Sequence, residues 1–341
     1  MKVLIRLNKK IFIITVSLLF TSSTFALETP MNKLSKYFKK GELIKIQSYT
    51  VPGWPNQYSS IKDGSYKNSP IEVDTFIAFP KNSEDPFPVL IFTYVSGGAK
   101  LFTDEWFKFN RLVAKSLLKK GITVMFLDNF SARGTRSTSS NQKAVSHFST
   151  YIDAFKALEY LSKDPRVNIK KVGITGWSRG GMISLMASEK RLRDALVSKD
   201  LYFAAAQPRS PDCWSAGMFR NPQPIKETKT WMVLGDADNY TLAKDCVKLG
   251  EKYKANGADI EITVKKGWHH GFTANYKEEH EGDAATFNDC PGAFTSDSGI
   301  IIYEGNQSFP ECIKYGAKIG GNKGGSFKKP FLKFFTESLL N

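Results

Sequence analysis

The sequence predicts an α/β fold with a mostly parallel central sheet, helices on both faces and an antiparallel N-terminal edge. Short apolar, β-branched runs alternate with longer amphipathic stretches, which is the pattern of consecutive strand–helix–strand units. Two early strands, at residues 43–48 and 71–79, have no helix between them. We therefore expect these two strands to pair with each other as the antiparallel edge.

The other expected elements follow from the same alternation. Pro88 and Gly97 bound the strand at 89–93, and Gly121 ends the helix at 104–119. Further strands are expected at 123–128, 172–175, 203–206, 230–234 and 260–264, and further helices at 149–163, 182–187, 242–254 and 329–339.

Residues 273–327 depart from this alternation. They are rich in Gly, Asn and Ser, so we expect an irregular insertion or cap near the site, because long irregular segments are often functional. The alternative is a surface loop that contributes only stability. With no internal repeat and no low-complexity linker, residues 27–341 are expected to form one domain.

The first 26 residues have the layout of a secretory signal peptide. Four basic residues among the first ten precede the apolar run 11–20, and small residues follow up to Ala26, where cleavage is expected. An uncleaved anchor is the alternative, but the run is short for a membrane span. We expect an exported protein, periplasmic or secreted, without stable membrane insertion after cleavage.

Four cysteines suit an oxidising compartment. Cys213, Cys246, Cys290 and Cys312 are an even set and lack the close spacing of a zinc site, so disulfides are expected. Three pairings are possible. We favour Cys213 with Cys246 and Cys290 with Cys312, the second of which would clamp the irregular segment. Four free buried thiols are the alternative.

The charge is strongly basic. The formal net charge is +15, and four of the positive charges lie in the expected signal segment. No basic helix with interleaved aromatic residues is present, so no nucleic-acid partner is expected. The excess is consistent with attraction to anionic surfaces or acidic substrates, or with solubility alone.

A nucleophile motif stands near the middle of the chain. Gly176, Ser178 and Gly180 follow the apolar run 172–175 and precede the expected helix at 182–187. Gly-x-Ser-x-Gly between a strand and a helix is the nucleophile elbow of α/β serine hydrolases. The alternative is a glycine-rich turn without chemistry.

A serine nucleophile needs a base, usually a histidine oriented by a carboxylate. In this class the order along the chain is Ser, acid, His. His147 precedes the serine, and His280 lies in a charged stretch. His269 and His270 follow the strand at 260–264. We favour His270, because the glycine after it lets the loop turn and present the ring, and assign His269 to packing.

The acid is expected after the preceding strand, where Asp236 and Asp238 compete. Asp238 is favoured because it opens the loop before the next helix, and Asp236 would then brace that loop; helix capping is the alternative for either. The oxyanion donors are expected to be the backbone N–H groups of Arg179 and Ser96.

Three side chains are candidates for substrate binding. Arg133 and Arg209 each follow a strand at the same sheet edge, where a guanidinium can hold a substrate carboxylate through two parallel hydrogen bonds. The alternative for each is a structural ion pair. Trp177, inside the elbow, is the third candidate.

Together these motifs resemble the dienelactone hydrolase family of the α/β-hydrolase superfamily, over roughly residues 88–272. The resemblance implies Ser178, Asp238 and His270 as a triad and supports pairing Cys213 with Cys246. Founding members of the family use a cysteine nucleophile, many relatives have a different oxyanion loop, and the segment from Ala274 has no counterpart. The matching segments are Leu127-Asp128-Asn129-Phe130 with Arg133-Gly134, Asp164-Pro165-Arg166-Val167, Gly176-Trp177-Ser178-Arg179-Gly180-Gly181, Gly235 to Asp238, and His270-Gly271-Phe272.

The resulting expectation is an exported serine esterase that acts on a small-molecule ester, with an anionic ester as one option. The chemistry needs no metal and no organic cofactor. An acyltransferase or peptidase with the same triad is a second hypothesis. A non-catalytic binding protein on a hydrolase scaffold is a third, motivated by the unusual oxyanion loop and the long late segment.

Overall fold

The computed structural model describes residues 29–53, 57–81, 86–103, 105–274, 277–286, 288–304, 312–321 and 323–341. The expected signal peptide, residues 1–26, lies outside these ranges. None of the helices in the described ranges combines the length and the apolar character that crossing a bilayer requires.

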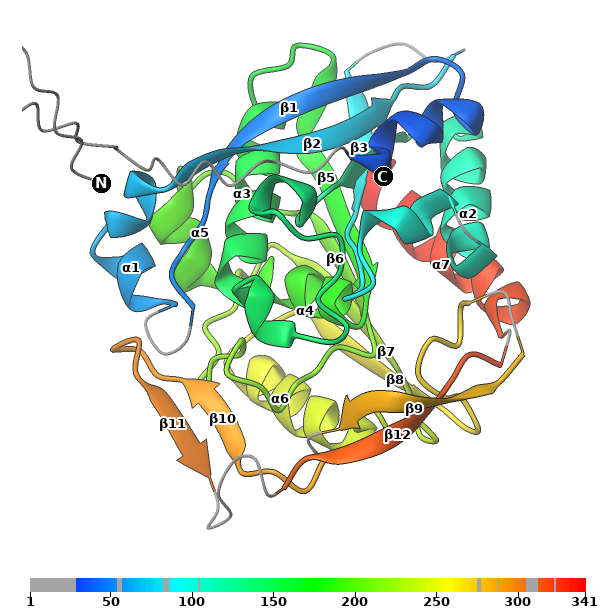
Figure 1. Cartoon of the computed structure of the whole chain (residues 1–341). Helices are drawn as coiled ribbons and strands as arrows, with labels where there is room; N and C mark the ends of the chain where they lie inside the picture. Colours follow the sequence, from blue (N-terminus) through cyan, green and yellow to red (C-terminus); the bar gives the residue numbers. More distant parts are fainter. Residues whose placement is uncertain are drawn as a thin grey trace, which may run out of the picture.

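A central sheet of eight strands organises the described part of the chain, in the order β1-β2-β4-β3-β5-β6-β7-β8. β1 pairs antiparallel with β2, and β2 with β4, while the remaining neighbours are parallel. The predicted parallel sheet with an antiparallel N-terminal edge is therefore confirmed (Figure 1). The strands are β1 Gly41–Tyr49, β2 Pro70–Ala78, β3 Phe87–Phe92, β4 Thr123–Leu127, β5 Val167–Trp177, β6 Ala205–Arg209, β7 Lys229–Gly235 and β8 Ile260–Lys265.

The helices connect these strands close to the expected positions, with three differences. α1 (Ser59–Lys62) and α5 (Lys190–Leu196) were not expected, and α7 begins at Gly324 instead of near 329. Two glycines make a poor helix start, but Phe327 is buried against Trp231, so packing outweighs local propensity. The other α-helices are α2 Lys108–Lys119, α3 His147–Leu161, α4 Arg179–Met186 and α6 Ala243–Ala255; short 3₁₀ turns are Pro30–Lys36, Ser65–Asn68, Ala99–Thr103, Glu105–Phe107, Ser131–Arg133 and Gln142–Ala144.

The buried strands separate two apolar layers. In β3, Val89 and Ile91 join one cluster, while Leu90 and Phe92 join the other, because successive side chains of a strand point to opposite faces. α2 and α7 cover the second face, and α3, α4, α5 and α6 cover the first (Figure 1).

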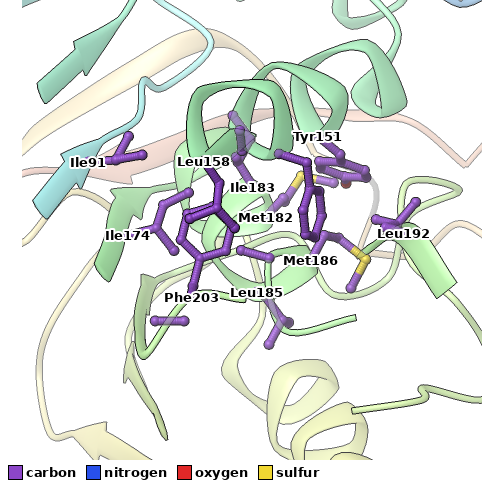
Figure 2. Close-up of a cluster of buried hydrophobic side chains, with 14 of the residues drawn as sticks. Ile91, Tyr151, Leu158, Ile174, Met182, Ile183, Leu185, Met186, Leu192 and Phe203 are labelled. Atoms are coloured by element: carbon purple, nitrogen blue, oxygen red, sulfur yellow. The ribbon is translucent and has the colours of Figure 1, made fainter. Parts of the chain in front are cut away.

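The first layer surrounds α4, the helix that follows β5. Figure 2 shows Met182, Ile183 and Met186 of α4 beside Tyr151 and Leu158 of α3. α4 is buried along its whole length, which explains why it has apolar and small residues on every side. This burial fixes the N-terminus of α4, where Ser178 and Arg179 lie.

The late segment, residues 273–327, contains regular structure where irregular chain was expected. β9 (Glu279–Thr286) pairs with β12 (Lys314–Ile319), and β10 (Gly292–Thr295) pairs with β11 (Ile301–Glu304), so the segment forms two antiparallel ribbons. β10 is held to the core because the Thr295 N–H donates to the Met218 carbonyl at 2.8 Å. The short strands were not expected because the Gly, Asn and Ser residues of this segment are typical of turns and loops.

Two disulfides connect these parts. Cys213 is bonded to Cys246, which joins the loop after β6 to α6, and Cys290 is bonded to Cys312 within the late segment. These are the two pairs that the sequence analysis favours. The second bond links the chain just before β10 to the chain just before β12.

Arg133 is a structural residue, which corrects its assignment to substrate binding. Its guanidinium forms an ion pair with Asp153 at 2.8 Å, and both side chains are almost fully buried. It also donates to the carbonyls of Asn129 and Tyr49, at 2.6 and 2.9 Å, and to the Thr50 hydroxyl. All its donors are therefore occupied in joining α3, β1 and the chain after β4, and none is left for a ligand.

This geometry predicts a large stability loss for Asp153→Asn. Removing the carboxylate leaves the buried Arg133 charge without its counter-ion, which costs about 3–5 kcal/mol in the free energy of unfolding. The matched control is Glu72→Gln, which breaks the exposed pair of Lys45 and Glu72 and should cost at most about 1 kcal/mol. Urea unfolding measures both, and equal losses would contradict the structural role.

Candidate active site

The backbone of Ser178 is strained at the junction of β5 and α4. Its φ is 57° and its ψ −121°, a conformation that L-residues rarely adopt. The Ser178 N–H donates to the Arg209 carbonyl at 2.9 Å, and its carbonyl accepts from the Met182 N–H at 2.9 Å. These bonds anchor the sharp turn to β6 on one side and to α4 on the other.

The two motif glycines are required by close approach of the backbone. A side chain at Gly176 would overlap the Thr93 hydroxyl and the backbone of Gly180. A Cβ at Gly180 would lie 2.7 Å from the Tyr94 carbonyl oxygen. The Gly-x-Ser-x-Gly pattern therefore has a steric cause in this fold, as the nucleophile-elbow interpretation expects.

A buried acid–imidazole pair lies near the elbow. His270 Nδ1 is 2.9 Å from Asp238 Oδ2, and the two side chains are almost completely buried. The Thr241 hydroxyl lies 3.1 Å from both His270 Nδ1 and Asp238 Oδ2. The backbone N–H groups of Tyr240 and Thr241 donate to Asp238 Oδ1, at 3.0 and 2.9 Å.

These contacts favour an ionised Asp238. Burial acts to raise its pKa, but the charge and hydrogen bond of His270 and the Thr241 N–H outweigh burial, so that the net pKa is lowered. A carboxylate on Nδ1 fixes the tautomer that carries its proton there. Nε2 is then the ring nitrogen left to accept a proton.

Both the backbone and the ring of His270 are held in place by contacts with other parts of the chain. Gly271 has a φ of 69°, which permits the turn directly after the histidine. The His270 carbonyl accepts from the Gly320 N–H at 2.7 Å, next to a bridge between His270 and Ile319. The ring lies against Trp177, the residue before Ser178, with centroids 5.3 Å apart.

The competing candidates occupy other positions. Asp236 is exposed and accepts from the Gly267 N–H at 2.6 Å, so it braces the loop. His269 contacts the Ala237 carbonyl at 2.8 Å and Glu278 at 2.9 Å. His280 is exposed on β9. His147 faces the cavity described next, where burial and the Arg179 charge lower its pKa well below the usual range.

A cavity of about 250 Å³ adjoins Ser178. Its wall includes Ser178, Arg179 and Ser96, the three residues expected to supply the nucleophile and the oxyanion donors. The late segment also contributes to the wall. The remaining lining residues are Gly53, Gln57, Gln142, Lys143, Val145, Ser146, His147, Met182, Asp212, Trp214, Ser215, Ala216, Tyr240, Thr241, Cys290, Pro291, Ala293 and Tyr303.

Two predicted substrate-binding residues do not line this cavity. Arg209 is buried on the opposite side of the sheet, where it donates to Asn110 and Thr273 and lies near the rings of Phe109 and Phe331. Trp177 is buried and stacks on Trp106, with centroids 6.0 Å apart. Both assignments are wrong, because strand alternation and the elbow direct these side chains away from the cavity.

Sequence reasoning missed Asp212 and Thr241. Asp212 follows β6 at the sheet edge for which Arg209 was named as a candidate, so its position in the sequence could have identified it as a candidate too. It lines the cavity and accepts from the Trp214 N–H at 3.1 Å. Burial raises the pKa of Asp212 to about 6, and the nearby Asp245 adds to the shift. Among the residues the structure describes, no group of three or more metal-ligating side chains is found.

The chain is similar to known proteins both in sequence and in structure. Residues 73–290 match the model of the dienelactone hydrolase family. Similar solved structures include the native thermophilic esterase Est2 of Thermogutta terrifontis, a planctomycete, at 17% identity and a TM-score of 0.45 over 59% of this chain and 79% of that one. The apo form of Thermogutta terrifontis esterase 2 is 18% identical, with a TM-score of 0.45 over 60% and 82%.

The raised pKa of Asp212 predicts a pH-dependent effect of Asp212→Asn. Between about pH 4 and pH 6, folded Asp212 keeps a proton that the unfolded chain has lost, so this group lowers stability as pH rises through that window. Asparagine has no such proton and still accepts from Trp214. The difference in the free energy of unfolding between the variant and wild type should therefore increase by about 1–3 kcal/mol in favour of the variant from pH 4 to pH 7. Urea unfolding at both pH values measures this, and a constant difference would refute it.

Proposed function

Since the chain belongs to the dienelactone hydrolase family and is an esterase-type hydrolase, we propose that it cleaves small-molecule carboxylic esters through Ser178, His270 and Asp238. The observation that carries this proposal is the 2.9 Å contact between His270 Nδ1 and buried Asp238, beside the strained serine turn. The cavity next to Ser178 gives the ester a place to bind.

The proposed reaction follows from these positions. The Ser178 hydroxyl oxygen attacks the ester carbonyl while His270 Nε2 accepts its proton, and Asp238 stabilises the resulting imidazolium. The proton then passes to the departing alkoxide as the C–O bond breaks, which leaves an acyl-serine. His270 next takes a proton from water as the water oxygen attacks the acyl-enzyme. It returns this proton to the Ser178 oxygen when the bond to the acyl group breaks, which releases the acid and restores the free enzyme.

The negative oxygen of each tetrahedral intermediate needs donors. The Arg179 N–H, in the first turn of α4, and the Ser96 N–H, in the loop after β3, are the proposed pair. Both residues line the cavity with Ser178. The positive end of the α4 dipole adds to this stabilisation.

We expect Ser178→Ala to abolish labelling by a fluorophosphonate probe and to lower kcat for short-chain 4-nitrophenyl esters by at least about 10³-fold. The loss follows from removal of the attacking oxygen. Gel fluorescence and initial rates measure the two effects. Wild-type protein that neither reacts with the probe nor turns over esters would refute the enzymatic proposal, including the transfer and peptidase alternatives.

Paired variants test the base and the acid. His270→Asn and Asp238→Asn should each lower kcat by about 10²- to 10⁴-fold, because the proton acceptor or its correct tautomer is lost. The neighbouring His269→Asn and Asp236→Asn are matched controls and should retain most activity. Losses of equal size in the controls would mean that loop integrity, and not proton transfer, accounts for the effect. Product analysis with added alcohol separates hydrolysis from acyl transfer.

We also propose that the protein is exported. The charged and apolar segment before Ala26 and the two disulfides support this. In a bacterial host with a periplasm, the full chain should be recovered from the periplasm or medium with Leu27 as its first residue. N-terminal sequencing checks the cleavage site, and cytoplasmic protein with an intact N-terminus would contradict export.

A further inference from the structure

We propose that Asp212, with the rings of Trp214 and Tyr240, forms an ammonium-binding subsite in the cavity next to Ser178, so that the preferred substrates are small esters carrying a cationic nitrogen. This inference rests on the proposed function and adds the class of substrate. Asp212 has no part in the proposed proton transfers, so its carboxylate is available for binding.

The Asp212 carboxylate has unused capacity for a ligand. It lines the cavity, and its Oδ1 accepts one hydrogen bond, from the Trp214 N–H at 3.1 Å. Within the described ranges, Oδ2 has no hydrogen-bond partner, and neither oxygen forms an ion pair with a lysine or arginine. An ionised carboxylate has about four acceptor positions, so most of those of Asp212 remain for a ligand.

Shielded carboxylates elsewhere in the fold have a cationic partner from the protein. Asp153 pairs with Arg133 at 2.8 Å, and Glu189 pairs with Arg191 at 2.7 Å. These pairs join elements of the fold to one another. Asp212 differs because it faces a cavity and has no such partner in the part of the chain that the structure describes.

The surroundings of Asp212 make its negative charge costly until a cation binds. Burial raises its pKa to about 6, and the charges of Asp245 and Asp238 act in the same direction, whereas that of His270 opposes them. The group is therefore ionised at neutral pH, without a counter-ion. A charge of this kind in a cleft beside a reactive serine is typical of a binding residue, because a ligand of opposite charge supplies the missing partner.

Two aromatic rings flank the carboxylate. Trp214 and Tyr240 line the cavity with Asp212, and the same three residues meet in the wall of a second cavity of about 10 Å³. An aromatic ring attracts a cation, as the Trp214 ring does with the Lys248 ammonium 5.1 Å from its centroid. The Tyr240 ring also contacts the His270 ring, with centroids 4.8 Å apart, so the subsite adjoins the proposed base.

The positive side chains of the cavity wall belong to another part of it. The Arg179 guanidinium donates to uncharged oxygens of residues 138–145, and Lys143 of the same segment is exposed. His147 is neutral at neutral pH. A cationic group is therefore repelled by the segment that holds Arg179 and attracted to Asp212, which orients the substrate in the cavity.

The test compares esters in which a trimethylammonium group is replaced by the isosteric tert-butyl group. On the alcohol side the pair is acetylcholine and 3,3-dimethylbutyl acetate. On the acyl side it is the 4-nitrophenyl esters of 6-(trimethylammonio)hexanoate and 7,7-dimethyloctanoate. Wild type should have the higher kcat/KM for the cationic member of at least one pair at neutral pH, which identifies the side that Asp212 contacts. Equal values, or a preference for the neutral member in both pairs, overturn the proposal.

Variants then assign the preference to Asp212. Asp212→Asn keeps an acceptor for the Trp214 N–H and should reduce the cationic-to-neutral ratio of kcat/KM by roughly 10- to 100-fold. The matched control is Asp245→Asn, which removes a neighbouring carboxylate that lines only the second cavity, and it should change the ratio less than about threefold. Equal changes of the ratio in both variants, or equal losses for both esters in Asp212→Asn, overturn the subsite.

The pH dependence of this ratio gives a readout that a structural role of Asp212 would not produce. Trimethylammonium keeps its charge at every pH, and titration of the proposed triad affects both esters alike. The ratio should therefore rise through about pH 6 in wild type, as Asp212 ionises, and stay level in Asp212→Asn. A level ratio in wild type contradicts the proposal. The titratable groups that act on Asp212 are Asp245 on α6, Asp238 and Tyr240 after β7, His270 after β8 and Tyr151 on α3.

A binding measurement keeps the inference separate from the proposed function. Choline should raise the thermal midpoint of wild type more than 3,3-dimethylbutanol does at equal ionic strength, whether or not Ser178 reacts with the fluorophosphonate probe. The difference should disappear in Asp212→Asn. If that variant does not fold, choline must still protect wild type more than the neutral alcohol does. The absence of any difference in wild type overturns the ammonium subsite and leaves the triad proposal intact.

Discussion

The strained turn at Ser178 is the constraint on which the rest of the site depends. A non-glycine residue at this φ and ψ costs of order 1–3 kcal/mol, so the surrounding structure must impose it. Three elements do so here: buried β5 before it, buried α4 after it, and β6, whose Arg209 carbonyl holds the Ser178 N–H. The apolar layer around α4 therefore positions Ser178 as well as stabilising the fold.

Three arginines show how the fold gives one residue type different roles. Arg133 is neutralised by Asp153 and joins the antiparallel edge to α3. Arg209 shares the opposite layer with aromatic rings and amide or hydroxyl oxygens. Arg179 lies at the N-terminus of a buried helix, beside the cavity. All three arginines lie at or just after the end of a strand at the same edge of the sheet. Their different roles therefore depend on what each side chain faces.

The fold was largely predictable from the sequence, since buried parallel strands are continuous apolar runs and the elbow motif marks its own strand–helix junction. Chain order and the glycines of the two loops also led to His270 as the proposed base and to Asp238 as the proposed acid. Side-chain direction was not predictable: Trp177 and Arg209 point away from the cavity, and Asp212 points into it. The ribbons of the late segment were missed because their short strands are bounded by turn residues, and their pairing is long-range.

The attachment of the late segment to the site has a structural consequence. Ile319 of β12 forms a β-bridge with His270, and the backbone N–H of Lys318 donates to Oδ1 of Asn239, which follows Asp238 directly. The same segment lines the cavity through Pro291 and Ala293. A change in the length or sequence of this segment would therefore alter the shape of the cavity and the positions of the loops that carry His270 and Asp238 at the same time.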